Sequence, residues 1–172
     1  MRMIIIRAII LPLLLVAHGL AWGGFDEGLA AAQRDDYDAA LREWQPLAEQ
    51  GNAEVQFVLG SIYDNGRGGI PQDFNKAMHW YRQAALQNHS SAQYNLGVLY
   101  DHGEGVPEDD AQAYMWFSVA FANGSGQFLI RILDELAQYM TPAQVAEGHR
   151  LTKEWLDKHP PTPPPDPSCI PY

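Results

Sequence analysis

Apolar residues recur at helical spacing along most of this chain, and one arrangement of them occurs twice. Residues 53–87 align with the stretch that follows when they are moved forward by 37 positions, so that Leu59 and Gly60 fall on Leu96 and Gly97. After a glycine-rich turn the offset drops to 36, which is what a one-residue loop insertion produces. A period in the mid-thirties is typical of a helical-hairpin solenoid, in which neighbouring units bury each other's apolar faces.

The periodicity predicts an all-α, right-handed solenoid of about four antiparallel helical hairpins. In this arrangement Gly60 lets the neighbouring helix approach closely, and Pro46 is expected to bend its helix. Thr141 to Gln144 has the pattern of a capping box, followed by an atypical terminal helix that closes the solenoid. The expected helices cover residues 25–33, 37–50, 53–63, 74–85, 92–100, 109–123, 127–139 and 142–158.

The N-terminal segment has the pattern of an export signal. Arg2 and Arg7 precede an uncharged run of 15 residues, 8–22, which is shorter than the roughly 20 residues needed to span a bilayer. We therefore predict a signal peptide over residues 1–21, cleaved after Ala21 or Gly23, rather than a membrane anchor. The processed protein would be periplasmic or secreted, with no stable membrane span.

The C-terminal residues 159–172 form a proline-rich segment, which favours an extended, disordered tail. Such a tail is either a ligand for an aromatic groove or a stiff solvated spacer. Cys169 is the single cysteine, so it is a free thiol or the link in a Cys169-linked dimer.

Charge narrows the class of partner. The chain has 11 basic and 21 acidic residues, and loss of Arg2 and Arg7 with the signal leaves nine basic residues and a formal net charge of −12. Such a field repels nucleic acid and anionic lipid and favours neutral or basic partners. The same acidity also serves solubility alone.

Motifs for catalysis, metals and cofactors are missing from the sequence. His79, His89, His102, His149 and His159 are scattered without the spacing of a zinc site. The glycine-rich turns lack the preceding strand and the following Lys-Ser/Thr of a phosphate loop. We therefore predict no catalytic residue, no metal site and no cofactor, and we interpret the Trp-aromatic pairs at 80–81 and 116–117 as core.

The repeated motifs resemble the Sel1-like repeat, a relative of the tetratricopeptide repeat. They are Leu-Gly-x-x-Tyr at 59–63 and 96–100, Gly-x-Gly-x-Pro-x-Asp at 103–109, and Lys-Ala-x-x-Trp-Tyr-x-x-Ala-Ala at 76–85. Residues 37–41 are similar to the opening half-repeat of exported bacterial members, and residues 140–147 with Trp155 are similar to their closing unit. The resemblance covers residues 25–158. The chain departs from the pattern at Gly69, an extra turn residue, and at 124–126, where Gly-Ser-Gly replaces the usual start of a repeat helix.

The resemblance implies a protein-binding module whose concave face is lined by the first helix of each hairpin. We expect the positions that the repeat does not need for packing to contact a partner, and these are Gln56, Phe57 and Ser61 in one copy and Gln93, Tyr94 and Val98 in the next. For Phe57 and Tyr94, packing between helices is an equal alternative, because aromatic residues at helical spacing are usually core.

The expected function is a non-catalytic scaffold of the bacterial cell envelope that binds a peptide or protein segment, and does not bind nucleic acid. One alternative is an enzyme, or a modulator of an enzyme, that acts on cell-wall material. Another is a structural subunit held in a larger assembly through the proline-rich tail and Cys169.

Overall fold

The computed structural model describes residues 24–161. The predicted signal peptide with its cleavage sites, Cys169 and most of the proline-rich tail lie outside the described residues. Within the described range every regular element is a helix, as the periodicity predicted. None of these helices has the length and apolar character needed to cross a membrane.

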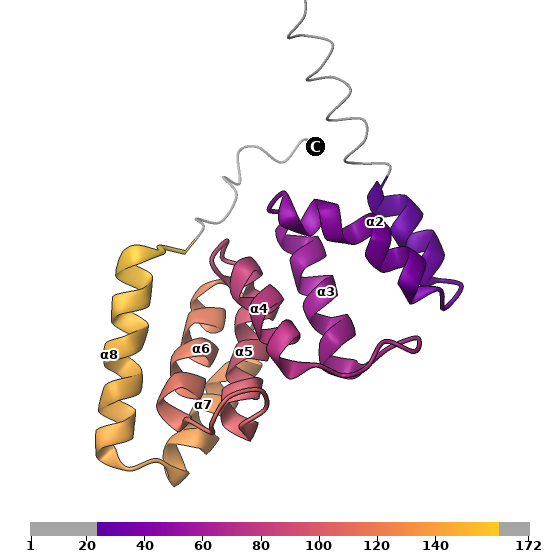
Figure 1. Ribbon diagram of the computed structural model, residues 1–172. Coiled ribbons are helices and arrows are strands. Elements are labelled where there is room, and N and C mark those ends of the chain that lie inside the picture. The colour runs from indigo at the N-terminus through magenta and orange to yellow at the C-terminus, as the bar shows by residue number, and fades with distance from the viewer. Residues whose placement is uncertain (1–23, 162–172) are drawn as a thin grey trace, which may run out of the picture.

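The helices succeed one another as a stack from the N-terminal end to α8 (Figure 1). The close packing partners include α3 with α4, α5 with α6, and α4 with α5, so each hairpin packs on the next. A first helix covers residues 24–32. The others are α2 Tyr37–Glu49, α3 Ala53–Asn65, α4 Phe74–Ala85, α5 Ser90–His102, α6 Asp110–Ala122, α7 Phe128–Tyr139 and α8 Pro142–Lys158.

Side-chain caps fix where most of these helices begin. A side-chain acceptor at the N-cap bonds the backbone N–H three residues on, which satisfies one of the unpaired donors of the first turn. At the start of α8 the predicted capping box is confirmed, since Thr141 and Gln144 bond each other's backbone. The capping residues are Asp36, Asn52, Asp73, His89, Asp109 and Thr141.

Each of the first three hairpins is closed by an aromatic ring lying on a glycine. A Cβ at Gly60 would lie 2.4 Å from Cδ1 of Tyr81, and one at Gly97 would lie 2.5 Å from Cε1 of Phe117. The predicted close approach at Gly60 is therefore confirmed. The helix over 24–32 shows the same contact, because Gly28 lies against the Trp44 indole and a Cβ there would lie 2.4 Å from its Nε1. Residues 24–49 thus form a hairpin of the same kind, although they lack the Leu-Gly-x-x-Tyr motif.

The last two helices depart from this arrangement. α7 has no glycine, and α8 packs closely on α6, the second helix of the preceding unit. Trp155 of α8 meets Trp116 of α6 edge to face at 4.6 Å between ring centroids. Gly148 lets Tyr114 approach, since a Cβ there would lie 2.9 Å from its ring. α8 thus closes the end of the stack on α6, and the close contact there uses a glycine of α8 itself.

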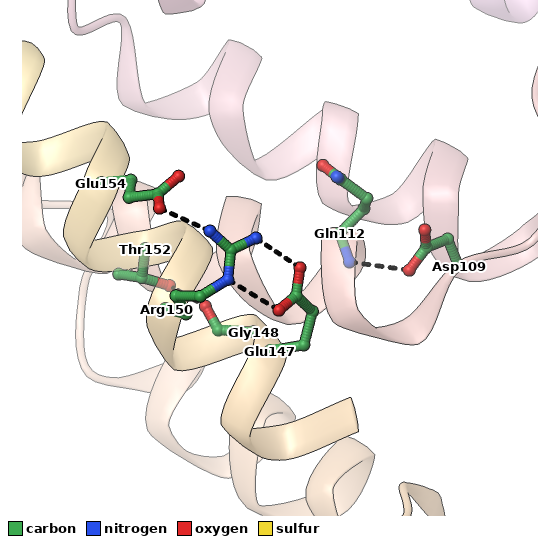
Figure 2. Close-up of polar contacts among 7 residues, drawn as sticks. All are labelled: Asp109, Gln112, Glu147, Gly148, Arg150, Thr152 and Glu154. Atoms are coloured by element: carbon green, nitrogen blue, oxygen red, sulfur yellow. Dashed lines mark hydrogen bonds and ion pairs between the residues drawn. The ribbon is translucent and has the colours of Figure 1, made fainter. Parts of the chain in front are cut away.

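The outward side of α8 is charged. Arg150 reaches both Glu147 and Glu154 on the same helix, with 2.8 Å from its Nε to Oε2 of Glu147 (Figure 2). Glu147 holds the pKa of Arg150 above its usual range, while the guanidinium lowers the pKa of Glu147. Water screens these exposed groups, so we assign the stability of α8 to its apolar contacts with α6.

The glycine contact generates a stability prediction. Gly60→Ala places a methyl group inside the van der Waals radius of the Tyr81 ring, so we expect a loss of about 2 kcal/mol in the free energy of unfolding, despite the better helix propensity of alanine. Urea denaturation followed by circular dichroism measures it. Gln83→Ala, at an exposed position of α4, is the control and should change stability by less than about 0.5 kcal/mol. A Gly60→Ala protein as stable as the parent would contradict the role given to this contact.

Candidate functional site

The structure places the two glutamines of the predicted site inside the fold. Gln56 is 4% exposed and Gln93 is fully buried. The expectation that the repeat does not need these positions for packing is therefore wrong. A buried amide must find hydrogen-bond partners within the protein, and both side chains do so.

These amides form a repeated hydrogen-bond ladder between helices. Gln56 donates from Nε2 to the Ala48 carbonyl at 2.8 Å and accepts from Gln87 Nε2 at 2.8 Å. One unit later, Gln93 donates to the Ala85 carbonyl at 3.1 Å and accepts from Asn123 Nδ2 at 3.0 Å. Each first helix is thereby tied to the second helix before it and to the end of the second helix after it.

Phe57 and Tyr94 are half-buried, so each has a packed side and an accessible side. Phe57 stacks on His89 with 4.7 Å between ring centroids and lies 5.9 Å from Tyr81. Tyr94 lies 5.6 Å from Phe117 and 5.8 Å from Phe128. Packing between helices is thus part of the role of both residues, and partner contact by their accessible sides stays a prediction.

The accessible sides of these two rings lie in two separate hollows. The α2–α3 hollow has a volume of about 230 Å³, and the α5–α7 hollow has one of about 360 Å³. The first is lined by Ala32, Tyr37, Trp44, Phe57, Val58, Ser61, Ile62 and Arg67. The second is lined by Ser90, Ser91, Tyr94, Gly124, Ser125, Gly126 and Phe128.

The remaining predicted residues, Ser61 and Val98, occupy the same position in successive repeats but have different surroundings. Ser61 is half-buried and lines the α2–α3 hollow. Val98 packs against the cluster formed by α6 and α7 around Phe117 and Leu129. Of the six predicted residues, Phe57 and Ser61 therefore meet in one hollow and Tyr94 lies in the other.

His89 is positioned between the two hollows by three contacts. Its Nδ1 accepts the Ala92 backbone N–H at 3.2 Å, capping α5, and its Nε2 lies 3.2 Å from Oε2 of Glu54 on α3. Because Nδ1 accepts, we assign the ring proton to Nε2, facing the carboxylate. With the Phe57 ring stacked on its face, the imidazole holds the start of α5 against α3. The sequence signal was its position, since His89 stands where Asn52 caps α3 in the preceding unit.

One partly buried polar pair, Asp64 and Tyr81, joins α3 and α4. Tyr81 donates its hydroxyl to Oδ2 of Asp64 at 3.0 Å. Burial raises the pKa of Asp64, and the hydrogen bond from Tyr81 partly offsets this rise. Burial and the nearby Asp64 charge raise the pKa of Tyr81, so its hydroxyl stays protonated and remains a donor.

A third hollow, between α6 and α8, was missed by the sequence reasoning. Trp155 and His159 stack in it with 4.2 Å between ring centroids. Their separation of four residues could have indicated this stacking, because residues at i and i+4 lie on the same face of a helix. The opposite wall of the hollow comes from α6 and depends on the packing of α8 against it. The hollow is lined by Met115, Leu151, Glu154, Trp155, Lys158 and His159.

The described residues contain no group of three or more His, Cys, Asp or Glu side chains that could hold a metal ion. His102, the last residue of α5, is exposed, and its Nε2 lies 3.6 Å from Oδ2 of Asp101. His149 packs edge to face on Tyr114 at 5.1 Å. These histidines contact single neighbours rather than converging on a site.

Comparison with known proteins identifies the repeats. The Sel1 repeat matches at residues 53–89 and 90–125. The crystal structure of a Sel1 repeat protein from Oxalobacter formigenes is 30% identical to this chain, with a TM-score of 0.60, over 71% of this chain and 97% of that one. The chain belongs to the Sel1 repeat family. Sel1 repeats are generally protein–protein interaction modules, and their fold is typically a non-catalytic scaffold.

A second solved structure extends the likeness across more of the chain. It is a protective antigen present in uropathogenic Escherichia coli strains that displays an SLR fold, 27% identical with a TM-score of 0.73. The match covers 81% of this Sel1 repeat chain, which spans only 30% of the length of that antigen. No curated protein matches the chain.

The hydrogen bond between Tyr81 and Asp64 leads to a prediction that a mutation of Tyr81 affects stability in a pH-dependent way. Because the pKa of Asp64 is raised in the folded state, the folded protein binds that proton more tightly than the unfolded chain, and stability falls as the pH rises from about 4 through the folded pKa. Tyr81→Phe keeps the ring on Gly60 but removes the donor that favours the carboxylate, so we expect a loss of about 1–3 kcal/mol at pH 7 and a smaller one at pH 4. Urea denaturation at both pH values measures it.

Asp64→Asn provides the background for the matched comparison, because it removes the titrating group and leaves an amide oxygen that accepts a hydrogen bond. In that background the effect of Tyr81→Phe should be equal at the two pH values. A pH-independent effect in the parent protein would argue against the assigned role of the Asp64 charge.

The amide ladder predicts a second stability effect. Gln93→Leu removes the hydrogen bonds to the Ala85 carbonyl and from the Asn123 amide, although these groups keep their bonds to the Asn88 N–H and the Val119 carbonyl. We therefore expect a loss of about 2 kcal/mol in the free energy of unfolding, at about 1 kcal/mol for each lost bond. Gln83→Leu, at an exposed position on α4, serves as the control. Chemical denaturation compares the two variants, and equal small effects would show that the ladder does not contribute measurably.

Proposed function

We propose that this protein is a non-catalytic scaffold of the bacterial cell envelope that binds a peptide or protein segment along its first helices. The family supports the coarse role, because Sel1 repeats are generally protein–protein interaction modules. The finer assignment to a peptide-binding surface is carried by the aromatic side chains Phe57 and Tyr94. They are equivalent in successive repeats, and each offers one accessible side to a hollow.

The two hollows have the composition expected of a recognition surface. Aromatic residues supply large contact areas at low conformational cost, and neighbouring hydroxyl groups supply adaptable hydrogen bonding. The α2–α3 hollow combines Phe57 with Ser61, and the α5–α7 hollow combines Tyr94 with Ser90 and Ser91. His89 lies between them, stacked on Phe57 and directly before Ser90. An extended segment crossing α3 and α5 would place side chains in both hollows.

The non-catalytic part of the proposal rests on how the unusual polar groups are used. The partly buried Asp64–Tyr81 pair joins α3 to α4, and the buried Gln56 and Gln93 bridge neighbouring helices. These groups therefore serve the packing of the repeats. His89 caps α5 through Nδ1, which occupies the nitrogen that a general base would need. The Sel1 fold, which is typically a scaffold, supports the same conclusion.

Placement in the envelope is supported by the signal-like pattern of residues 1–21 and by the acidity of the remaining chain. A related structure belongs to a protective antigen of uropathogenic Escherichia coli, and an antigen of this kind is compatible with a protein outside the cytoplasm. We propose the periplasm as the compartment.

Affinity capture from an envelope extract tests the proposal. The baits are residues 24–172, the same chain ending at His159, and the double variant Phe57→Ala/Tyr94→Ala. We expect the third bait to capture at least about tenfold less of a protein that the first two baits hold, because the alanine substitutions remove the aromatic contacts. Tyr139→Ala, which removes the most exposed large side chain on α7, is the control and should capture as the parent does.

Circular dichroism melting of every bait separates lost binding from lost folding. Ser61→Arg/Ser91→Arg provides a second test, since it fills both hollows without removing a buried aromatic contact. A partner retained by both folded double variants would overturn the surface assignment, and one held only by the full-length bait would move binding to the proline-rich tail.

A further inference from the structure

The α2–α3 hollow differs from the α5–α7 hollow in carrying a charge. Tyr37, Trp44 and Phe57 give it three aromatic side chains, and Ser61 gives it one hydroxyl. Arg67 is the single charged residue among the described side chains that line it. An apolar hollow with one cation at its wall selects for a ligand that joins an apolar group to an anion.

Arg67 has no carboxylate within ion-pair distance among residues 24–161. Arg34, Arg42, Arg82 and Lys158 likewise lack an ion pair among these residues, but none of them lines the α2–α3 hollow. By contrast, Lys76, Arg150 and Lys153 each lie near an acid on their own helix or its cap. The guanidinium at the hollow is thus available to an external anion, and its planar fork matches a carboxylate in a bidentate geometry.

The turn that carries Arg67 is held in place by packing and hydrogen bonds. The Ile70 N–H donates to the Arg67 carbonyl at 2.9 Å. Gly68, with φ +57°, lies against the Tyr37 ring so closely that a Cβ would come within 2.0 Å of it. This contact holds the turn against the wall of the hollow and so fixes the position of the Arg67 backbone beside it.

The repeat itself does not account for an arginine at this position. Thirty-seven residues later the same turn position holds Glu104, and Ser61 corresponds to Val98. Glycine does recur, because Gly105 lies against Phe74 as Gly68 lies against Tyr37. The backbone of the turn is therefore a shared structural feature, whereas Arg67 and Ser61 are replaced by Glu104 and Val98 at the equivalent positions of the second copy.

We propose that the α2–α3 hollow binds the C-terminal residue of a partner peptide, with its apolar side chain against the aromatic walls and its free carboxylate on Arg67. This inference rests on the proposed peptide-binding function and names the chemistry of one of its two hollows. The volume of about 230 Å³ lies below the roughly 300–1,000 Å³ typical of small-molecule pockets, so it suits one residue rather than a run of peptide. A C-terminal residue carries the apolar group and the carboxylate together, whereas an internal acidic residue would need a neighbour to fill the hollow.

Two small probes that differ only in charge test this assignment. N-acetyl-L-leucine carries the carboxylate, and N-acetyl-L-leucinamide is its neutral match. Each is titrated into ¹⁵N-labelled protein, residues 24–172, and followed by the backbone amide shifts of Phe57, Ser61 and Arg67. We expect saturable shifts with the acid and an affinity at least about tenfold weaker for the amide, because the charge-assisted hydrogen bonds are lost.

Arg67→Gln should weaken binding of the acid to the level of the amide. Arg42→Gln removes an exposed arginine from α2 without touching the hollow and controls for the overall change in charge. It should leave the affinity within about twofold, since distant surface charges are screened. Unchanged amide shifts in α5 and α6 confirm that each variant is folded.

Each contrary result has a distinct meaning. Equal affinity for the two probes, or equal effects of Arg67→Gln and Arg42→Gln, overturns the carboxylate assignment and leaves the apolar hollow available to the proposed function. Absence of shifts with either probe also overturns this inference. Only the capture experiment with the Phe57 and Tyr94 variants then decides whether the first helices bind a partner.

Discussion

The structure depends on a close contact between a glycine of one helix and an aromatic ring of the next. Gly28 with Trp44, Gly60 with Tyr81 and Gly97 with Phe117 each bring two helices together at a distance that any Cβ would prevent. The large ring buries much apolar area while the small partner lets the backbones approach. The spacing of these pairs sets the hairpins, and the hairpins set where the first helices lie.

Where this contact is missing, the architecture changes. α7 has no glycine to receive a ring, and α8 packs on α6 through Trp155 and Gly148. α7 then buries only Leu129 fully, and Phe128 and Ile130 stay exposed. The last unit of a solenoid has no further repeat to cover it, so an atypical unit with a charged outer side is needed to close the stack. Here the ending also leaves Phe128 at the edge of the α5–α7 hollow, next to Tyr94.

The polar groups of the repeats fall into two classes with different consequences for binding. Buried groups such as Gln93 and Tyr81 have partners within the protein, so they hold helices together and are not available to a ligand. Exposed groups such as Ser91 and Arg67 line hollows and face solvent. The distinction matters because Phe57 and Tyr94, which line hollows, recur at the same spacing as the buried Gln56 and Gln93. Recurrence alone therefore does not separate a packing residue from a binding residue.

Apolar periodicity, capping residues and glycine-rich turns act locally, so the amino-acid pattern was enough to predict the helices and the repeat that relates them. The predicted bounds differ from the observed ones by up to two residues, as at α5, which begins at Ser90 rather than at residue 92 because His89 caps it. The pattern also indicated the close approach at Gly60. It did not show that Gln56 and Gln93 are buried, since an amide at helical spacing has the same pattern whether it faces solvent or a carbonyl of another helix. The burial of these amides follows from tertiary packing, as do the packing of α8 on α6 and the position of Arg67 beside Tyr37, Trp44 and Phe57. Those contacts join residues distant in sequence, and they depend on which helix backbones can approach each other.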